Sequence, residues 1–424
     1  MRIFAAFSKT QIMLRKSLLI ALLTGIVGSS FAQLVTPGDR ANDVQLNTIT
    51  TAVPFLQIAP DSRAGALGDA GVASSPDASA MHWNPAKLAF TDKEMEFAVS
   101  YSPWLRQLVN DMNLGYLTGY KKLNDQQAVA GALRYFSLGT ISFTDNTGQE
   151  IRTFQPNEFS LDVAFSQKLS ERFSGGIAAR YIHSNLTGGT NIQGVDSKPG
   201  RSVAVDVSAF YTNDDLELGN TDITWNWGIN ISNIGAKMSY TQTADRDFIP
   251  TNLRLGTALT LNLDQYNDLG FIVDFNKLLV PTPPVYDPEN PTEVLVGENP
   301  DVGVAAAIFQ SFSDAPGVYS YDQNGEVTVE DGSVFREELR EINIGGGVEY
   351  WYDRQFAFRA GYFYEHLSKG NRQFITLGAG LKYQVLGFDL SYLISTTQQN
   401  PLANTLRFTL RFELLSAREA ARQG

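Results

Sequence analysis

From Met95 to the C-terminus, apolar and polar residues alternate with a period of two. Successive side chains of a β-strand point to opposite faces, so this pattern predicts strands with one apolar and one polar face. The alternation is strict in the last segment, where Leu406, Phe408, Leu410 and Phe412 are separated by polar residues. It predicts fourteen strands, at 94–101, 113–121, 127–136, 159–167, 173–183, 201–211, 224–231, 252–262, 270–278, 341–350, 356–365, 373–383, 388–394 and 405–414.

The polar face of these strands favours a membrane barrel over a soluble sandwich. A sandwich would expose charged outer faces, whereas this face is rich in Gly, Ser, Asn and Thr with scattered charges, as in a crowded barrel lumen. The sequence therefore predicts an all-β fold, a 14-stranded antiparallel transmembrane β-barrel of a Gram-negative-type outer membrane. Tyrosines near the predicted strand ends would form its interfacial girdles, and they are Tyr101, Tyr120, Tyr181, Tyr211, Tyr350, Tyr364 and Tyr383.

Connection lengths predict the orientation of the barrel. Connections after even-numbered strands are mostly short, such as 122–126 and 351–355, and those after odd-numbered strands are mostly longer, such as 137–158 and 232–251. Outer-membrane barrels have short periplasmic turns and long extracellular loops. We therefore expect the first strand to begin at the periplasmic end and the long connections to lie at the cell surface.

The longest connection, residues 279–340, has two interpretations. It begins with a proline-rich stretch, which is stiff and extended, and becomes acidic after Glu326. Its apolar run at 302–312 is compatible with a short helix or with an extra strand that would change the strand count. The whole insertion is either an extracellular loop that binds a partner or a solvated lid over the lumen.

The N-terminal 93 residues lack the alternation. Two basic residues, the apolar run 18–27 and small residues before Gln33 have the layout of a secretory signal peptide. The run is shorter than the about 20 residues of a membrane-spanning helix, which is the alternative. We predict a signal peptide at 1–32, a periplasmic extension and plug or hatch segment at 33–93, a barrel at 94–414 and a periplasmic tail at 415–424.

The segment Ala52–Phe90 is dense in Gly, Ala, Ser and Pro, so no regular element runs through it, yet it is too apolar for a flexible linker. Directly ahead of a closed sheet, such a segment is expected to pack inside that sheet as a plug. Glycines would permit close approach to the inner wall, and an Asn-Pro pair would turn the chain into the first strand. These plug residues are Gly65, Gly68, Gly71, Asn84 and Pro85.

Composition excludes several kinds of function. Without cysteine the chain has no disulfide and no thiolate metal site, and its net charge of −12 argues against a nucleic-acid partner. The three histidines stand outside metal-binding spacings, and no G-x-S-x-G motif occurs. We expect no cofactor, no metal site and no enzyme activity, although a triad assembled from separate strands would leave no local motif.

Two sets of side chains are candidates for contacts. Trp104, Leu105 and Leu108 are expected to be exposed at the tip of the first long loop, where they would contact a protein partner or lie in the outer headgroup layer. Charges on the polar face either line a permeation path or pair with one another, and pairing is favoured because buried charges are usually paired. These charges are Asp162, Arg180, Asp206, Arg254, Arg359, Arg407 and Arg411.

Four runs carry a family resemblance, and they are Thr50-Thr-Ala-Val-Pro-Phe-Leu, Asp61-Ser-Arg-Ala-Gly-Ala-Leu-Gly-Asp-Ala-Gly-Val-Ala, Asp77-Ala-Ser-Ala-Met-His-Trp-Asn-Pro-Ala-Lys-Leu-Ala and Ser311-Phe-Ser-Asp-Ala-Pro-Gly. Together they resemble the PorV family, the outer-membrane barrels of the type IX secretion system, which belong to a FadL-like superfamily. The element Asn84-Pro85-Ala86 is shared with that wider superfamily. The tail departs from common outer-membrane practice, because it places no aromatic residue at the terminus.

The resemblance implies a function and partners. PorV-like proteins bind the C-terminal signal domains of exported cargo, collect them from a large translocon barrel and pass them to a cell-surface attachment complex. The implied partners are therefore outer-membrane lipid, the translocon barrel, cargo signal domains and the attachment complex, which the extracellular loops would contact. The alternative is FadL-like uptake of a hydrophobic small molecule, which requires a conduit through the lumen.

Overall fold

The computed structural model describes residues 46–414, without 107–108, 110, 145–146, 190, 193–194, 242–245, 288, 291, 322–326 and 398–401, and it describes only the backbone of 191–192 and 195–196. The predicted signal peptide (1–32), residues 33–45 of the predicted extension, Leu108 and the predicted tail (415–424) lie outside the described residues.

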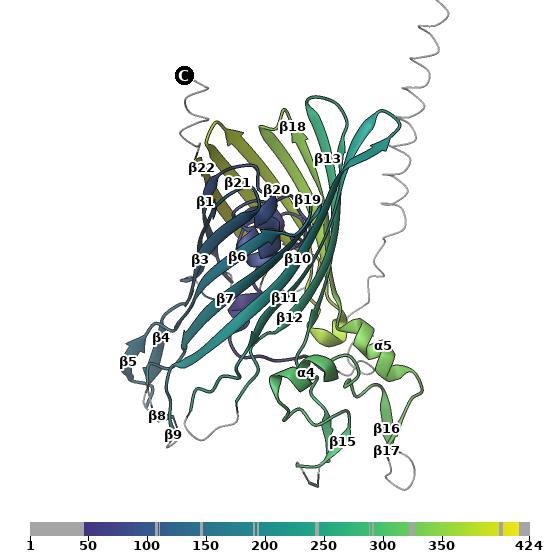
Figure 1. Ribbon diagram of the computed structural model, residues 1–424. Helices are drawn as coiled ribbons and strands as arrows, with labels where there is room; N and C mark the ends of the chain where they lie inside the picture. The colour runs from purple at the N-terminus through teal and green to yellow at the C-terminus, as the bar shows by residue number, and fades with distance from the viewer. Residues whose placement is uncertain are drawn as a thin grey trace, which may run out of the picture. The chain divides into compact units, whose positions relative to one another are not determined.

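Fourteen antiparallel strands close into one barrel, and the last strand pairs with the first (Figure 1). The predicted strand number and order are confirmed. The strands are β1 (Met95–Pro103), β2 (Met112–Lys122), β3 (Gln127–Leu138), β6 (Asn157–Lys168), β7 (Phe173–Asn185), β10 (Gly200–Leu218), β11 (Thr221–Gly235), β12 (Asn252–Asn262), β13 (Asn267–Leu278), β18 (Asn343–Tyr352), β19 (Phe356–Tyr364), β20 (Gln373–Tyr383), β21 (Leu386–Ser395) and β22 (Leu406–Leu414).

The alternation of residue types corresponds to the two faces of the wall. In β22, Phe408 and Leu410 are exposed on the outer face, whereas Arg407 and Thr409 are buried toward the lumen. The same inside-outside pattern follows β1, β6 and β7. None of the described helices is long and apolar enough to cross a membrane.

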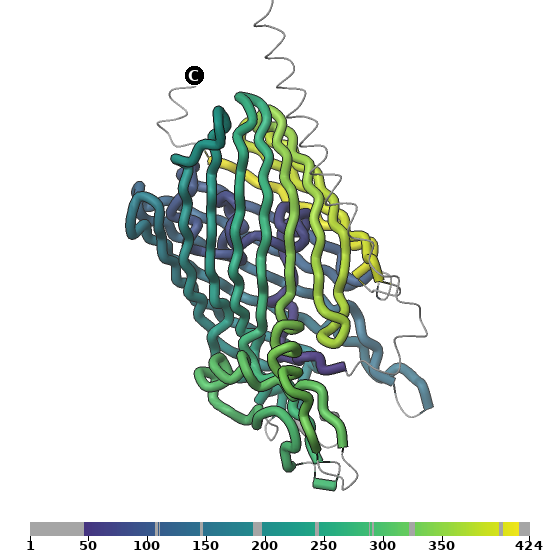
Figure 2. Tube along the Cα trace, turned by 90° about the vertical axis from the view of Figure 1, so that its right-hand side faces the viewer, coloured from purple at the N-terminus to yellow at the C-terminus, as the bar shows by residue number. Residues whose placement is uncertain are grey.

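The two ends of the barrel differ in their connections. At the end where β1 begins and β22 finishes, which we call the turn end, short connections join neighbouring strands, and at the opposite loop end the connections are long (Figure 2). Because outer-membrane barrels have short periplasmic turns, we assign the turn end to the periplasm. One expected connection, 212–223, differs: β10 and β11 continue through it to a turn at Gly219 and Asn220.

The loop end carries its own small elements, and they are β4 (Ile141–Thr144), β5 (Glu150–Phe154), β8 (Asn191–Ile192), β9 (Val195–Asp196), β14 (Val285–Tyr286), β15 (Val294–Val296), α4 (Val304–Gln310), β16 (Tyr319–Tyr321), β17 (Val327–Val329), α5 (Ser333–Arg340) and η3 (Leu367–Lys369). The apolar run at 302–312 contains helix α4 and no added barrel strand. Of its two interpretations the helix is therefore confirmed.

The N-terminal segment lies inside the barrel (Figure 1). It contains η1 (Pro54–Gln57), α2 (Ser62–Gly65), α3 (Ala80–Trp83) and η2 (Pro85–Phe90). Its first described residues lie among the long loops, since the N–H of Asn47 donates to Ser368 O (2.9 Å) and that of Ala52 to Phe248 O (2.8 Å). The sequence predicts a periplasmic extension here, but residues 46–52 lie at the loop end, and the chain then crosses the lumen to reach β1.

Candidate functional site

We define the plug as residues 52–94. It is hydrogen-bonded to the barrel wall around most of the circumference of the barrel. In one of these contacts, Asp274 of β13 accepts the backbone N–H groups of Gly71 (2.6 Å) and Val72 (2.8 Å). Eleven strands contribute a side chain that hydrogen-bonds to the plug, and examples from each are Thr118, Arg134, Ser166, Ser174, Ser208, Asn230, Arg254, Asp274, Glu349, Thr376 and Thr409. The plug thus fills the lumen as a bonded part of the fold.

The three plug glycines predicted from the sequence differ in their surroundings. Gly68 has a φ of +71°, and a Cβ there would lie 2.7 Å from the backbone oxygen of Gly346 and closer still to that of Tyr362. A Cβ at Gly65 would meet the Arg407 guanidinium of the wall. Gly71 instead lies against the ring of Trp83, within the plug itself.

Wall glycines that face the plug were not singled out from the sequence. A Cβ at Gly347 would lie 2.8 Å from the Cα of Leu67, and one at Gly361 would lie 2.7 Å from the same atom. A Cβ at Gly345 or at Gly378 would lie closer still to plug atoms, the oxygen of Gly68 and the Cβ of Ala66. The sequence does indicate them, because these glycines fall at lumen-facing positions of three consecutive barrel strands, β18, β19 and β20.

Asn84 and Pro85 hold the plug rather than join it directly to the barrel. The Asn84 Oδ1 accepts the N–H of Ala86 (3.1 Å), which caps η2, and its Nδ2 donates to Ala209 O of β10 (3.0 Å) and to Val72 O (3.2 Å). Pro85 is the first residue of η2. The chain therefore passes through this helical turn before β1 begins at Met95.

Buried charges fasten the plug to β18. The guanidinium of Arg63 pairs with Asp77 of the plug (2.9 Å) and with Glu349 (2.8 Å), and Arg359 of β19 also pairs with Glu349 (2.6 Å). Burial raises the pKa of Asp77, but the attractions of Arg63, Lys87 and Arg411 together outweigh burial and lower that pKa below its usual value. The pair is therefore ionised at neutral pH.

The three histidines lie in different elements. His82 is buried in the plug, where burial and the nearby Arg134 and Arg254 lower its pKa well below the usual value. Its neutral ring faces the Arg134 guanidinium at 2.6 Å. His183 is on β7, and His366 bonds to the N–H of Ser368. Among the described residues, no group of three or more acidic or histidine side chains is arranged to hold a metal ion.

The charges predicted to face the lumen are mostly paired. Arg180 bridges Asp162 (2.7 Å) and Asp206 (3.1 Å). Arg359 and Arg411 both pair with Asp389, and Arg407 pairs with Asp69 of the plug. Arg254 differs, because it donates to His82 O (3.2 Å) and lies over the Trp83 ring. These contacts favour space-filling ion pairs over a permeation path.

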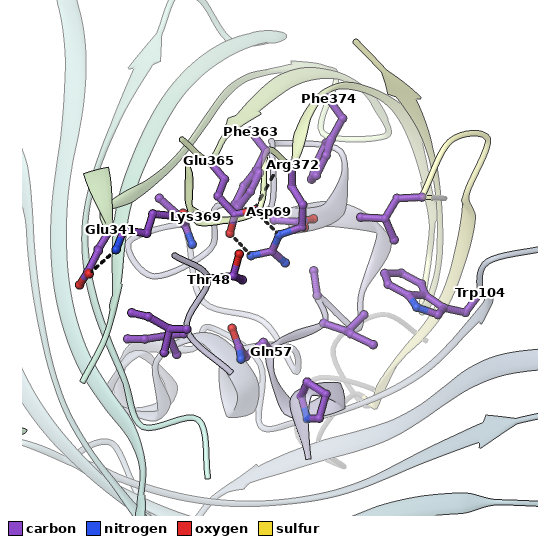
Figure 3. Close-up of a pocket in the computed structure, with 18 of the residues that line it drawn as sticks. Thr48, Gln57, Asp69, Trp104, Glu341, Phe363, Glu365, Lys369, Arg372 and Phe374 are labelled. Carbon is purple, nitrogen blue, oxygen red and sulfur yellow. Dashed lines mark hydrogen bonds and ion pairs between the residues drawn. The ribbon is translucent and has the colours of Figure 1, made fainter. Parts of the chain in front are cut away.

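A cavity of about 320 Å³ lies at the loop end, between the plug and the wall (Figure 3). Phe363 and Phe374 stack beside it with ring centroids 4.9 Å apart. The charged side chains along it include Arg372 with Glu365 (2.7 Å), Lys369 with Glu341 (2.9 Å) and Arg407 with Asp69 (2.8 Å). Because these cations and anions already pair with each other, the cavity offers no evident counter-ion to a charged ligand.

The first long loop does not present the side chains that the sequence places at its tip. Trp104 is only 9% exposed and packs in a cluster with Phe55 and Leu56 of the plug. Leu105 is partly buried against the same cluster. The expected exposure is therefore wrong for Trp104, because the plug reaches the loop end and covers it. The proposed partner-binding role of Trp104, Leu105 and Leu108 stays a prediction.

A buried ionic network anchors the insertion to the rim of the barrel. Lys277, at the end of β13, pairs with Glu338 (2.9 Å) and Glu341 (2.6 Å). Lys369 pairs with Glu341 (2.9 Å) and Glu337 (2.6 Å). The network therefore joins the end of β13, the insertion and the connection between β19 and β20, and it holds α5 in place.

The pH dependence of this anchorage follows from Asp314. Burial, reinforced by the negative charges of Glu338 and Glu341, raises the pKa of Asp314 to about 7. A carboxyl with a raised pKa stabilises the folded form below its unfolded pKa, and that stabilisation is lost as the pH rises through about 7. We expect limited proteolysis of the insertion to be faster at about pH 8.5 than at about pH 6.

Asp314→Asn is expected to remove most of this pH dependence, because an amide does not titrate. Asp301→Asn is the matched control, since the Asp301 side chain is 95% exposed in the same insertion. The interpretation is wrong if D314N keeps the pH profile of the parent protein. The measurement is the rate at which cleavage in the insertion produces the N-terminal and the C-terminal fragments of the chain.

The comparisons with known proteins identify the family. The model of the type IX secretion system protein PorV matches residues 40–285, more than half of the chain. The chain belongs to the PorV family. The matched region contains the whole plug and the strands from β1 to β13. The protein is thus an outer-membrane component of type IX secretion, and the predicted localisation is confirmed.

Solved structures with the same kind of fold are distant in sequence. The toluene transporter TodX of P. putida is 12% identical, with a TM-score of 0.46 over 85% of this chain and 99% of that chain. A FadL homologue of Pseudomonas aeruginosa is 12% identical (TM-score 0.39, 87% and 99%), and the toluene transporter TbuX of Ralstonia pickettii is 10% identical (0.41, 84% and 96%). No curated protein matches significantly in sequence. At these distances the matches indicate nothing about a substrate.

Proposed function

We propose that this PorV-family barrel binds the C-terminal signal domains of exported cargo with its loop end and carries them, as a membrane anchor, from the translocon to the surface attachment complex. Membership of the family supports a role in type IX secretion. The observation that carries the rest is the plug, because it is bonded to wall residues from β2 to β22. A lumen filled in this way leaves the long loops as the surface for a folded partner.

The loop end has the features of a protein-binding surface. Large apolar side chains are exposed there, including Ile151 on β5 (68%) and Phe309 on α4 (78%). Exposed apolar side chains outside the lipid-facing wall indicate contact with a partner, and a few of them usually carry most of the binding energy. The anchored insertion would present such side chains without a large ordering cost on binding.

The affinity of a purified cargo signal domain tests the proposal. We expect Ile151→Ser combined with Phe309→Ser to weaken binding by roughly tenfold or more, because truncated hot-spot residues cost about 2 kcal/mol or more each. Leu169→Ser is the matched control, since Leu169 is 65% exposed but lies in a turn at the opposite end. Unchanged affinity in the double variant, or equal loss in the control, would contradict binding at the loop end.

The alternative function is uptake of a hydrophobic molecule, which the cavity beside Phe363 and Phe374 favours. This function requires a path past the plug, whose backbone is bonded to Asp274 and Thr376. Lipid extraction and mass spectrometry of the gently purified protein separate the two functions. A stoichiometric hydrophobic ligand without co-purifying cargo would favour uptake.

A further inference from the structure

An apolar groove of about 230 Å³ lies on the outside of the barrel, where the insertion meets the wall. One side is formed by strands β12 and β13, and the other by α5, by Ile342 after it and by Phe312 after α4. The apolar residues that line it are Leu253, Leu255, Phe275, Phe312, Phe335, Leu339 and Ile342.

The strand residues of the groove belong to the outer face of the barrel. Leu255 and Phe275 are opposite each other in the β12–β13 ladder and are 42% and 43% exposed. Their neighbours Arg254 and Asp274 are buried toward the lumen. Because side chains alternate along a strand, the groove is continuous with the wall that faces lipid.

The height of the groove corresponds to the outer membrane interface. Phe275 pairs with Ile344 of β18, and Ile344 pairs with Tyr364 at the loop end of β19. Outward-facing tyrosines near the loop ends of β1, β3, β7 and β19 are exposed, and they are Tyr101, Tyr135, Tyr181 and Tyr362. Such a girdle marks the boundary between acyl chains and headgroups.

Helix α5 is oriented as an interfacial helix would be. Its acidic Glu338 faces the barrel, where it neutralises Lys277, an outward-facing residue of β13 that would otherwise bring a charge to the membrane boundary. Phe335 and Leu339, one helical turn apart, are 68% and 51% exposed and line the groove. An amphipathic helix of this kind lies with its apolar face at the acyl-chain boundary.

We propose that the groove holds an acyl chain of an outer-leaflet lipid, so that α5 rests in the outer interface and fixes the insertion to the membrane surface. The occupant follows from the continuity of the groove with the lipid-facing wall and from its position at the aromatic girdle. The flank of the barrel at β12 and β13 is then covered by lipid. This inference depends on the outer-membrane location and is independent of cargo binding.

Fluorescence quenching in vesicles tests the proposal directly. The chain has no cysteine, so single cysteines can be labelled cleanly. We would place a small fluorophore at L339C in the groove, at V273C on the lipid-facing wall and at R336C. The Arg336 side chain is 53% exposed and pairs with Glu330 away from the groove. The vesicles contain phosphatidylcholine brominated near the top of its acyl chains.

The expected result is that the label at position 339 loses most of its fluorescence to brominated lipid, as at position 273, and is protected from aqueous iodide. The label at 336 should show the reverse. Quenching of 339 by iodide alone would overturn the proposal. Protection of 339 in native membranes, with iodide quenching both in pure vesicles and in vesicles of the extracted outer-membrane lipid, would also overturn it and assign the groove to a protein partner. Heat-modifiable migration in electrophoresis shows that each variant is folded.

Discussion

Gly68→Val is expected to displace the plug and to lower the free energy of unfolding by more than about 4 kcal/mol, a loss that few single substitutions produce. Two effects add. A non-glycine residue in the left-handed conformation costs about 1–2 kcal/mol, and the φ of Gly68 is +71°. A branched side chain would also push against the backbone oxygens of Gly346 and Tyr362, and strands cannot move apart without breaking their ladder.

Gly148→Val separates these two effects. Gly148 has a φ of +82°, but its added Cβ would meet nothing within 4 Å in an exposed loop. We expect this control to cost only the conformational part, about 1–2 kcal/mol. Denaturant unfolding in detergent, followed by intrinsic fluorescence, measures both variants. Equal destabilisation of G68V and G148V would show that the plug does not press against β18 and β19.

The barrel was predictable because its strands meet two different environments. β12 and β20 occupy the predicted ranges, 252–262 and 373–383, since lipid on one side and the crowded lumen on the other impose a residue type on each face. The extension of β10 and β11 through 212–223 was not predictable from hydropathy. There Asp214 and Asp215 are both exposed at an irregularity of the β10–β11 ladder, so alternation disappears, and backbone pairing resumes between Leu216 and Ile223.

The plug was predictable as a segment but not in its contacts. A chain without periodicity carries no register, so its partners are set by residues far away in sequence. Gly68 bonds to Thr376, which is 308 positions later, and Ser62 bonds to Thr409. The same reason explains Trp104, whose cover comes from Phe55 and Leu56 rather than from its own loop. The path of the chain from the loop end to the turn end likewise has no local signal.

Arg63→Ala is expected to have the second-largest effect, about 3–5 kcal/mol, because it leaves buried carboxylates with too few partners. Arg63 contributes bonds to Asp77, Glu349 and the Ser75 carbonyl, all inside the barrel. Glu349 keeps Arg359, whereas Asp77 loses the cation that lowers its pKa most. The plug should therefore loosen at its contact with β18, and ion conductance across a planar bilayer should rise.

The surface pair of Arg172 and Asp215 supplies the control for this prediction. Both side chains are exposed, so Arg172→Ala should leave both the stability and the conductance nearly unchanged. The pH dependence gives a further distinction. Asp77, with its lowered pKa, stabilises the folded parent above the unfolded pKa, and this contribution is lost as the pH falls through the folded pKa. R63A should therefore lose less stability than the parent on acidification. An R63A barrel with parental stability, conductance and acid sensitivity would mean that the plug is held by its backbone hydrogen bonds alone.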